Sequence, residues 1–248
     1  MTWFIIQIQF LTRIPVPIKV NFTEKKLAQS IILAPLVGLI IGFLLSGIYY
    51  LFSFMNQKAV TVLFVIISEI IITGGLHLDG LADTFDGIFS NRPKNQMLEI
   101  MRDSRIGTNG TLALVVIILA KTVLLFSIKE DLIFYSIILM PVLSRLNIVW
   151  AAGISTYARK GKGMAKAIVN YCRTREIIIS TVISFAICAL LFRIELLILL
   201  PVSIIFLVIL VQYVKKKIGG ITGDIIGAVI ELSEVFILLS IIIMGNIK

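Results

Sequence analysis

Long apolar runs alternate with short polar intervals along this chain. Runs of about 17 to 24 residues recur, and a helix rising about 1.5 Å per residue needs a run of that size to cross a bilayer. The runs are continuous and lack the period-two alternation of a barrel strand. The pattern predicts an all-α, polytopic integral membrane protein with about seven transmembrane helices. The predicted spans are residues 31–54, 59–75, 111–127, 132–152, 177–192, 196–214 and 225–243.

A shorter apolar segment precedes the first span. Residues 3–11 are too few to cross a bilayer, and Arg13, Pro15 and Pro17 follow at once. This arrangement predicts a helix that lies at the membrane interface. The first residues lack a basic region and a small-residue cleavage site, so they do not indicate a cleaved signal. We expect residues 1–248 to form a single transmembrane domain.

Composition supports the membrane class. The chain is 58% hydrophobic and 15% charged, with a mean hydropathy of +1.04, values that exclude an ordinary soluble domain. Its net charge of +9 would hint at nucleic acid on a soluble protein. Because the basic residues cluster between spans, the lipid bilayer and its anionic headgroups explain them, and no nucleic-acid partner is expected. Cys172 and Cys188 are too few for a disulfide framework or a thiolate metal site.

The basic residues also predict an orientation. With seven spans, seventeen of the 23 Lys and Arg residues fall on one side, and Lys121 and Arg145 lie within spans. The positive-inside rule places that side, with the N-terminus, in the cytoplasm. The long polar loops 77–110, 154–176 and 215–224 share it, so we expect them to form the active-site face. The predicted location is the cytoplasmic (inner) membrane of a bacterium or archaeon.

Interval 77–110 is the most acidic part of the chain. If the segment around Asp79, Asp83 and Asp86 is helical, their side chains fall at about 0°, 40° and 340° around the axis and share one face. Like charges at i,i+4 repel, so a cation should lie among them. Carboxylate oxygens suit Mg²⁺ or Mn²⁺ bound together with substrate phosphates. The alternative is a solvated acidic face at the membrane surface.

Small residues accompany these acids. Gly80, Ala82 and Gly87 alternate with the aspartates, and small residues let a bulky phosphate ligand approach the backbone. The nearby His77 is the only histidine and could act as a general base near neutral pH. It lies about 160° from the acids on a helical wheel, however, and could simply cap the preceding span.

The segment from Arg102 to Gly110 is a candidate phosphate cradle. Arg102 and Arg105, a hydroxyl and glycines precede a span, where backbone N–H groups at a helix start attract anions. The alternative is membrane anchoring by the arginines together with helix capping by Thr108 or Asn109.

A third polar segment enters the last span. Asp224, Gly227, Glu231 and Glu234 form one stripe on a helix, beginning at the turn formed by residues 219–223. Acids inside a span are costly and usually face a cavity or a partner. We expect the stripe to face a cavity at the cytoplasmic mouth. The alternative is structural ion pairing with Lys121 or Arg145.

The first span contains Gly38 and Gly42, a spacing that lets two helices approach closely. Its glycine-rich character is compatible with self-association, so a homo-oligomer is possible.

Four ordered motifs resemble the adenosylcobinamide-GDP ribazoletransferase (cobalamin 5′-phosphate synthase) family. They are spread over nearly the whole chain, which makes the similarity specific. The motifs are FLTRIPVP at residues 10–17, GGLHLDGLADTFDG at 74–87, MRDSRIGTNG at 101–110 and GGITGDIIGAVIE at 219–231.

The resemblance implies a late step of cobalamin assembly. Adenosylcobinamide-GDP would donate its cobinamide phosphoryl unit to α-ribazole or its 5′-phosphate and release GMP, with Mg²⁺ required. Asp79, Asp83 and Asp86 would hold the metal, and one of them or His77 would act as the base. The implied substrate-binding residues are Arg13, Arg102, Asp103, Arg105, Asn109, Arg145, Thr222, Asp224 and Glu231.

Two other functions compete with this one. CDP-alcohol phosphotransferases share the DGxxA opening, but their motif continues with an arginine after the alanine, where this chain has Asp83. A cation-coupled transporter could use Glu69, Glu231 and Glu234, but the sequence has no inverted repeat.

Overall fold

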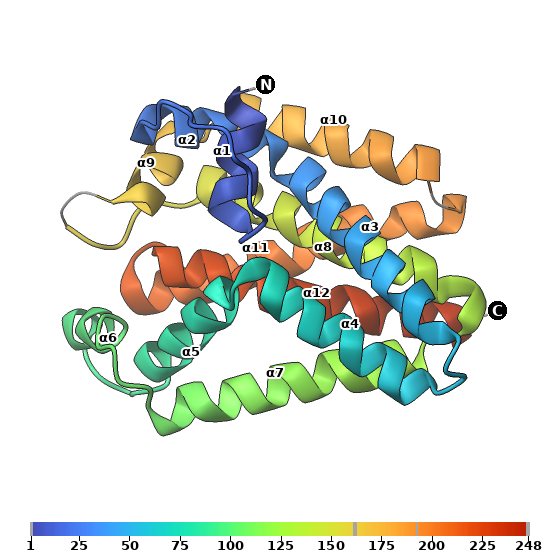
Figure 1. The fold of residues 1–248 in the computed structure, drawn as a ribbon. Coiled ribbons are helices and arrows are strands. Elements are labelled where there is room, and N and C mark those ends of the chain that lie inside the picture. Colours follow the sequence, from blue (N-terminus) through green and yellow to red (C-terminus); the bar gives the residue numbers. More distant parts are fainter. Residues whose placement is uncertain (1, 161–162, 192, 247–248) are drawn as a thin grey trace.

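The structure is a computed structural model that describes residues 2–160, 163–191 and 193–246. Each of the seven predicted spans is a helix over its described part, and the helices run along one another in a bundle (Figure 1). Residue 192, the end of the fifth predicted span, lies outside the described residues. Among the residues that the structure describes, six helices are long and apolar enough to cross a membrane, or seven if a bent pair counts as one span. The all-α polytopic class is therefore confirmed. The long helices are α3 (Ala34–Ser53), α4 (Lys58–Thr73), α7 (Thr108–Ser127), α8 (Glu130–Ile154), α10 (Thr174–Leu191), α11 (Leu199–Ile218) and α12 (Gly223–Asn246).

Most of the shorter helices lie at one end of this bundle (Figure 1). The predicted N-terminal helix is α1 (Thr2–Leu11), whose buried Gln7 donates a 2.8 Å hydrogen bond to Ser30 Oγ and so docks α1 on α2. The remaining short helices are α2 (Glu24–Ser30), η1 (Ile31–Leu33), α5 (Leu76–Ile88), α6 (Lys94–Ile100), α9 (Met164–Tyr171) and η2 (Ile194–Ile198).

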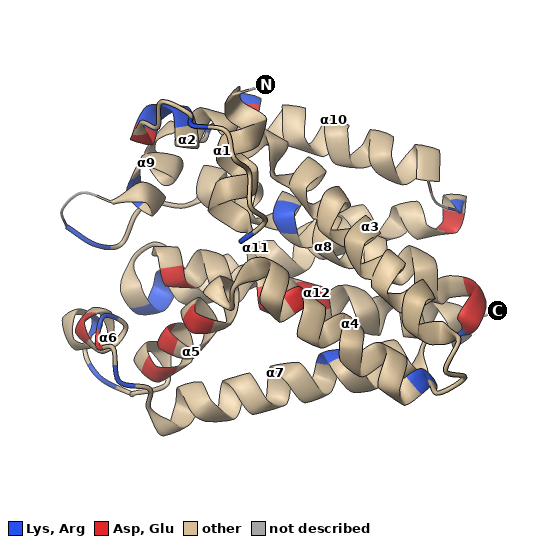
Figure 2. Cartoon of the chain, viewed as in Figure 1, with Lys and Arg blue, Asp and Glu red and all other residues tan. Residues whose placement is uncertain are grey.

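The polar connections meet at the end of the bundle that carries α5, α6 and α9 (Figure 1). Ile221 N donates to Thr156 O at 2.8 Å, and Ala158 N donates to Ile221 O at 2.9 Å. The predicted loops 154–176 and 215–224 therefore touch. Many Lys, Arg, Asp and Glu residues gather at this end, although a smaller group lies at the opposite end (Figure 2).

Helix α8 runs through the buried centre, and α3 packs closely on it. A Cβ atom at Gly38 would lie 2.2 Å from Pro141 O, and one at Gly42 would lie 2.8 Å from Ile138 Cα. The glycine pair therefore brings two helices of the same chain together, as its spacing predicts. Since this face is already occupied by α8, the glycine pair gives no support to self-association.

We predict that Gly38→Ala destabilises the protein while Gly47→Ala on the same helix does not. Overpacking at a close contact costs about 1–3 kcal/mol, whereas a Cβ at Gly47 meets no atom within 4 Å. Thermal unfolding in detergent, followed by intrinsic fluorescence, should show a lower Tm for Gly38→Ala only. Equal Tm values for the two variants would contradict the α3–α8 contact.

Candidate active site

Two consecutive glycines form the turn between α4 and α5. Gly74 and Gly75 have φ values of +65° and +68°, a left-handed conformation that glycine adopts without steric cost. Helices α4 and α5 consequently meet at a bend of 88°. A Cβ at Gly74 would also lie 2.5 Å from Arg13 Cγ, because the Arg13 side chain passes over this turn. The bend carries α5 off the axis of α4.

The three aspartates lie on one face of α5, as the spacing predicts. Helix α5 spans Leu76–Ile88 without interruption, so Asp79, Asp83 and Asp86 occupy successive turns of one face. Asp79 is exposed, and the other two are half-buried. The opposite side of α5, which includes Leu81 and Thr84, is buried against the bundle. The acidic face is therefore open to approaching ligands.

The start of α12 lies against α5 at a contact that only small residues permit. A Cβ at Gly80 would lie 2.8 Å from Asp224 O, and one at Gly227 would lie 3.1 Å from His77 O. A Cβ at Gly87 would likewise lie 2.9 Å from Met97 O on α6. The expectation that the small residues of α5 admit a phosphate to the backbone is wrong for Gly80 and Gly87, because neighbouring helices fill that space.

This contact adds a fourth carboxylate to the acidic face. Burial, followed by the charges of Asp224 and Asp79, raises the pKa of Asp83 to about 7. Burial disfavours ionisation of this carboxyl most, and the neighbouring negative charges add to that effect. A bound cation would therefore reduce the repulsion among these carboxylates. Carboxylate oxygens are also the ligands that Mg²⁺ and Mn²⁺ prefer.

Asp86 already has partners of another kind. Its carboxylate accepts hydrogen bonds from Gly107 N at 2.7 Å and Gly110 N at 2.8 Å, at the start of α7. Asp86 thus caps α7, and the alternative of capping by Thr108 or Asn109 is wrong, since the N-cap residue is Gly107 and Thr108 and Asn109 already lie within the helix. Two N–H groups of the predicted phosphate cradle are engaged by this carboxylate.

The structure does not assemble the predicted metal ligands around one point. Across residues 2–160, 163–191 and 193–246, no group of three or more His, Cys, Asp or Glu side chains has the geometry of a metal site. Asp86 faces the start of α7, which leaves Asp79 and Asp83 as the nearest candidates. Metal binding by the three aspartates remains a prediction.

An arginine that the motifs did not single out completes the acidic end of α12. Arg159 Nη2 donates to Asp224 Oδ2 at 2.6 Å and to Met101 O at 3.3 Å. The buried Thr222 hydroxyl donates to the same Asp224 oxygen at 3.2 Å. In the sequence, Arg159 is one of several basic residues in loop 154–176, and no motif marks it. Because Arg159 is far in sequence from every acidic motif, the sequence does not indicate that it contacts Asp224.

The α6–α7 connection forms a rim beside the acids. Arg105 Nη2 pairs with Asp103 Oδ2 at 2.6 Å, and its hydrogen bonds lower the pKa of Asp103 to about 2. The Arg105 side chain is 88% exposed, and Arg102 is exposed as well. Asn109 is half-buried in the first turn of α7. The arginines of this rim are accessible to an anionic substrate.

A buried ion network occupies the middle of the bundle. Lys121 Nζ lies 3.2 Å from Glu69 Oε1 and 2.7 Å from Glu231 Oε2, and it also pairs with Glu234. Arg145, which is fully buried, pairs with Glu234 as well. These ion pairs connect four helices, α4, α7, α8 and α12.

The cavity-facing interpretation is therefore wrong for Glu231 and Glu234, and the alternative of structural ion pairs is confirmed. The cavity beside Glu69, Lys121 and Glu231 has a volume of about 10 Å³, which is no larger than a water requires. The structure thus offers Arg145 and Glu231 no contact with a substrate. Charges at this depth need partners, because an unpaired ion within the membrane is costly.

His77 does not join the acidic face. Its ring is 3% exposed, and neither ring nitrogen has a hydrogen-bond partner among the described residues. It lies on the side of α5 that packs beneath α12, as its wheel position indicates. The geometry does not support a general base here, and α4 ends at Gly74 without a cap from His77.

Comparison with known proteins decides the family. A sequence profile described as cobalamin-5-phosphate synthase matches residues 3–242, which is nearly the whole chain. The chain belongs to the cobalamin-5-phosphate synthase family. Membership confirms the resemblance and decides against a CDP-alcohol phosphotransferase or a transporter.

Relatives of this family are similar along their full lengths. The adenosylcobinamide-GDP ribazoletransferase of Clostridium acetobutylicum is 44% identical, with 96% of this chain and 94% of the relative covered. The enzyme of the same name from Acetivibrio thermocellus is 43% identical, with 95% of each chain covered. That from Fusobacterium nucleatum is 40% identical, with 98% of each covered. No solved structure matches the chain significantly.

The ion network predicts a large stability cost for Glu234→Gln. This change keeps the shape of the side chain but removes a charge shared by Lys121 and Arg145. Breaking a buried pair costs about 3–5 kcal/mol, because the partner charges stay buried. Thermal unfolding in detergent should show a much lower Tm than for the control Glu99→Gln on exposed α6. A Tm equal to that of the control would show that the network is not structural.

Proposed function

We propose that the chain catalyses transfer of the cobinamide phosphoryl group from adenosylcobinamide-GDP to α-ribazole or α-ribazole 5′-phosphate. The products are adenosylcobalamin or its 5′-phosphate, together with GMP, late in cobalamin biosynthesis. The family match and the printed names of the relatives support this reaction. The observation that carries it in the structure is the juxtaposition of Asp79, Asp83 and Asp224 with Arg159.

The proposed cofactor is Mg²⁺, with Mn²⁺ as a substitute. Asp79 and Asp83 would hold the ion, and Asp86, whose two oxygens each accept one backbone N–H bond, keeps further lone pairs with which it would join them. The donor chemistry fits, because carboxylates are hard oxygen ligands and the charges of Asp224, Asp79 and Asp86 all act on Asp83. When bound, such an ion neutralises the oxygens of a pyrophosphate and stabilises the departing phosphate.

The side chains around the acids supply the other requirements of phosphoryl transfer. Arg159 is positioned by Asp224, and a guanidinium can bind phosphate oxygens through two parallel N–H groups. Arg102 and Arg105 on the exposed rim add positive charge where the donor would enter. Since His77 is enclosed, an aspartate of α5 is left to accept the proton of the attacking hydroxyl.

The proposed setting is the cytoplasmic face of a bacterial or archaeal inner membrane. The bundle presents large apolar side chains outward, among them Leu119 at 58% and Ile209 at 65% exposure, which suits lipid. The loops with most of the basic residues lie at the same end as the acidic face. The positive-inside rule therefore places the site beside the cytoplasm, where its water-soluble substrates would arrive.

We predict that Asp83→Asn reduces GMP release about 100-fold or more, because loss of this charge weakens stabilisation of the pyrophosphate by a cation. Release is measured with purified protein, adenosylcobinamide-GDP, α-ribazole and Mg²⁺. The matched control is Asp131→Asn, which removes an exposed ion pair with Arg193 at the opposite end.

Asp131→Asn should keep normal turnover, because exposed pairs contribute little. Both variants should insert and elute from gel filtration like the parent protein. Substantial ribazole transfer by Asp83→Asn would contradict the assignment of the acidic face as the catalytic site.

A further inference from the structure

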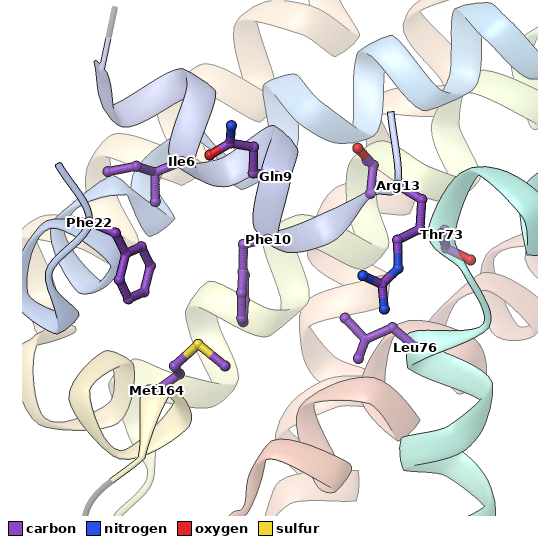
Figure 3. A pocket seen from close by; sticks show the side chains of 9 residues that line it. Ile6, Gln9, Phe10, Arg13, Phe22, Thr73, Leu76 and Met164 are labelled. Carbon is purple, nitrogen blue, oxygen red and sulfur yellow. The ribbon is translucent and has the colours of Figure 1, made fainter. Parts of the chain in front are cut away.

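A cavity of about 320 Å³ lies between α1 and the start of α5. Its walls include Phe10 on α1, Arg13 after it, Phe22 before α2, Leu76 on α5 and Met164 on α9 (Figure 3). The volume falls at the lower end of the range for pockets that bind small molecules. Four segments far apart in sequence thus enclose one space next to the acidic helix.

Three side chains of this pocket carry planar groups, the rings of Phe10 and Phe22 and the guanidinium of Arg13. The Phe10 ring projects into the middle of the view, with Phe22 and Met164 on one side of it (Figure 3). The planar guanidinium of Arg13 and the Leu76 side chain lie on the other side. Aromatic rings and guanidinium planes both stack on the face of an aromatic ligand. The pocket therefore suits a flat, fused ring.

The pocket continues into the acidic face. Relative to Leu76, the side chains of Asp79 and Asp83 lie at about 300° and 340° around α5, so the three share one side of the helix. A ligand whose ring fills the pocket would therefore extend along α5 toward the carboxylates. Such a ligand has an aromatic base at one end and a reacting oxygen at the other.

The polar groups of the pocket narrow the choice of base. The Thr12 hydroxyl donates to Ile8 O at 2.7 Å and the Thr73 hydroxyl to Glu69 O at 2.9 Å, so both donors are already used. The Arg13 guanidinium has no hydrogen-bond or ion-pair partner among the described residues. No lining residue is acidic, so the N–H edge of guanine would meet no carboxylate. The amide NH₂ of Gln9 donates to Val16 O and Ile18 O, which leaves its Oε1 as the one side-chain amide acceptor of the lining. A largely apolar base with a hydroxyl or phosphate tail fits better.

We propose that this pocket binds the fused aromatic base of the acceptor nucleoside, with Arg13 facing its sugar and phosphate. The inference rests on the proposed function, because the acceptor is taken from that reaction. A base in this pocket directs the attacking hydroxyl of the ribose along α5 toward the acids. The donor's guanine would then bind elsewhere.

The test compares two pocket variants with a control aromatic. Phe22→Ala removes a side chain that is 49% exposed, and Phe10→Leu keeps apolar volume but removes the aromatic face. Each should raise the KM for α-ribazole about tenfold, the size of effect seen when base stacking is lost. The KM for adenosylcobinamide-GDP and kcat should stay within about twofold. Phe43→Ala on the outward surface of α3 should change none of these values.

Arg13→Gln separates the two acceptors. It should weaken binding of α-ribazole 5′-phosphate more than binding of α-ribazole, because only the first carries a phosphate for the guanidinium. Equilibrium dialysis with each acceptor alone measures this difference without turnover.

Two results would overturn the pocket assignment. One is an unchanged acceptor KM in both Phe22→Ala and Phe10→Leu, and the other is a rise in the donor KM instead. A parent protein that releases no GMP would reject the proposed reaction itself. Dialysis would still decide the pocket in that case, since α-ribazole must bind the parent about tenfold more tightly than Phe22→Ala.

Discussion

The close contact between α5 and the start of α12 is the constraint on which the acidic site depends. Gly80 lets the backbone of Asp224 approach, and Gly227 does the same for the backbone of His77. A side chain at either glycine would push the helices apart and separate Asp224 from Asp83. The ion network around Lys121 holds α12 in the middle of the bundle by pairing it with α4, α7 and α8. Site geometry and buried charge are thus parts of one arrangement.

The helices and the acidic face could be predicted from sequence because both follow from periodicity. Continuous apolar runs locate the seven spans, and the spacing of Asp79, Asp83 and Asp86 places them on one face. The partners of the acids could not be predicted in the same way. A polar stripe through Glu231 and Glu234 looks the same whether it lines a cavity or pairs with cations of another helix. The depth at which Lys121 and Arg145 lie decides between the two, and only the packed bundle shows it.

Two site features had no usable signal in one sequence. Arg159 reaches Asp224 from a loop that no motif marks, and Asp86 uses its oxygens for the backbone of α7. Both carboxylates are thereby held in place while Asp79 and Asp83 stay accessible. The bundle also brings Phe10 and Arg13 beside the start of α5 and gives the N-terminal segment a place next to the chemistry. Family membership supplies the reaction, and these contacts supply the reason that it would occur at this end.

The proposed divalent-cation centre on the acidic face of α5 can be tested with crystals of the protein soaked in Mn²⁺ and measured at the manganese absorption edge. We expect an anomalous difference peak about 2 Å from carboxylate oxygens of Asp79 and Asp83. A fully active protein with no peak beside these aspartates, or with its only peak at another group of ligands, would rule out this cation centre.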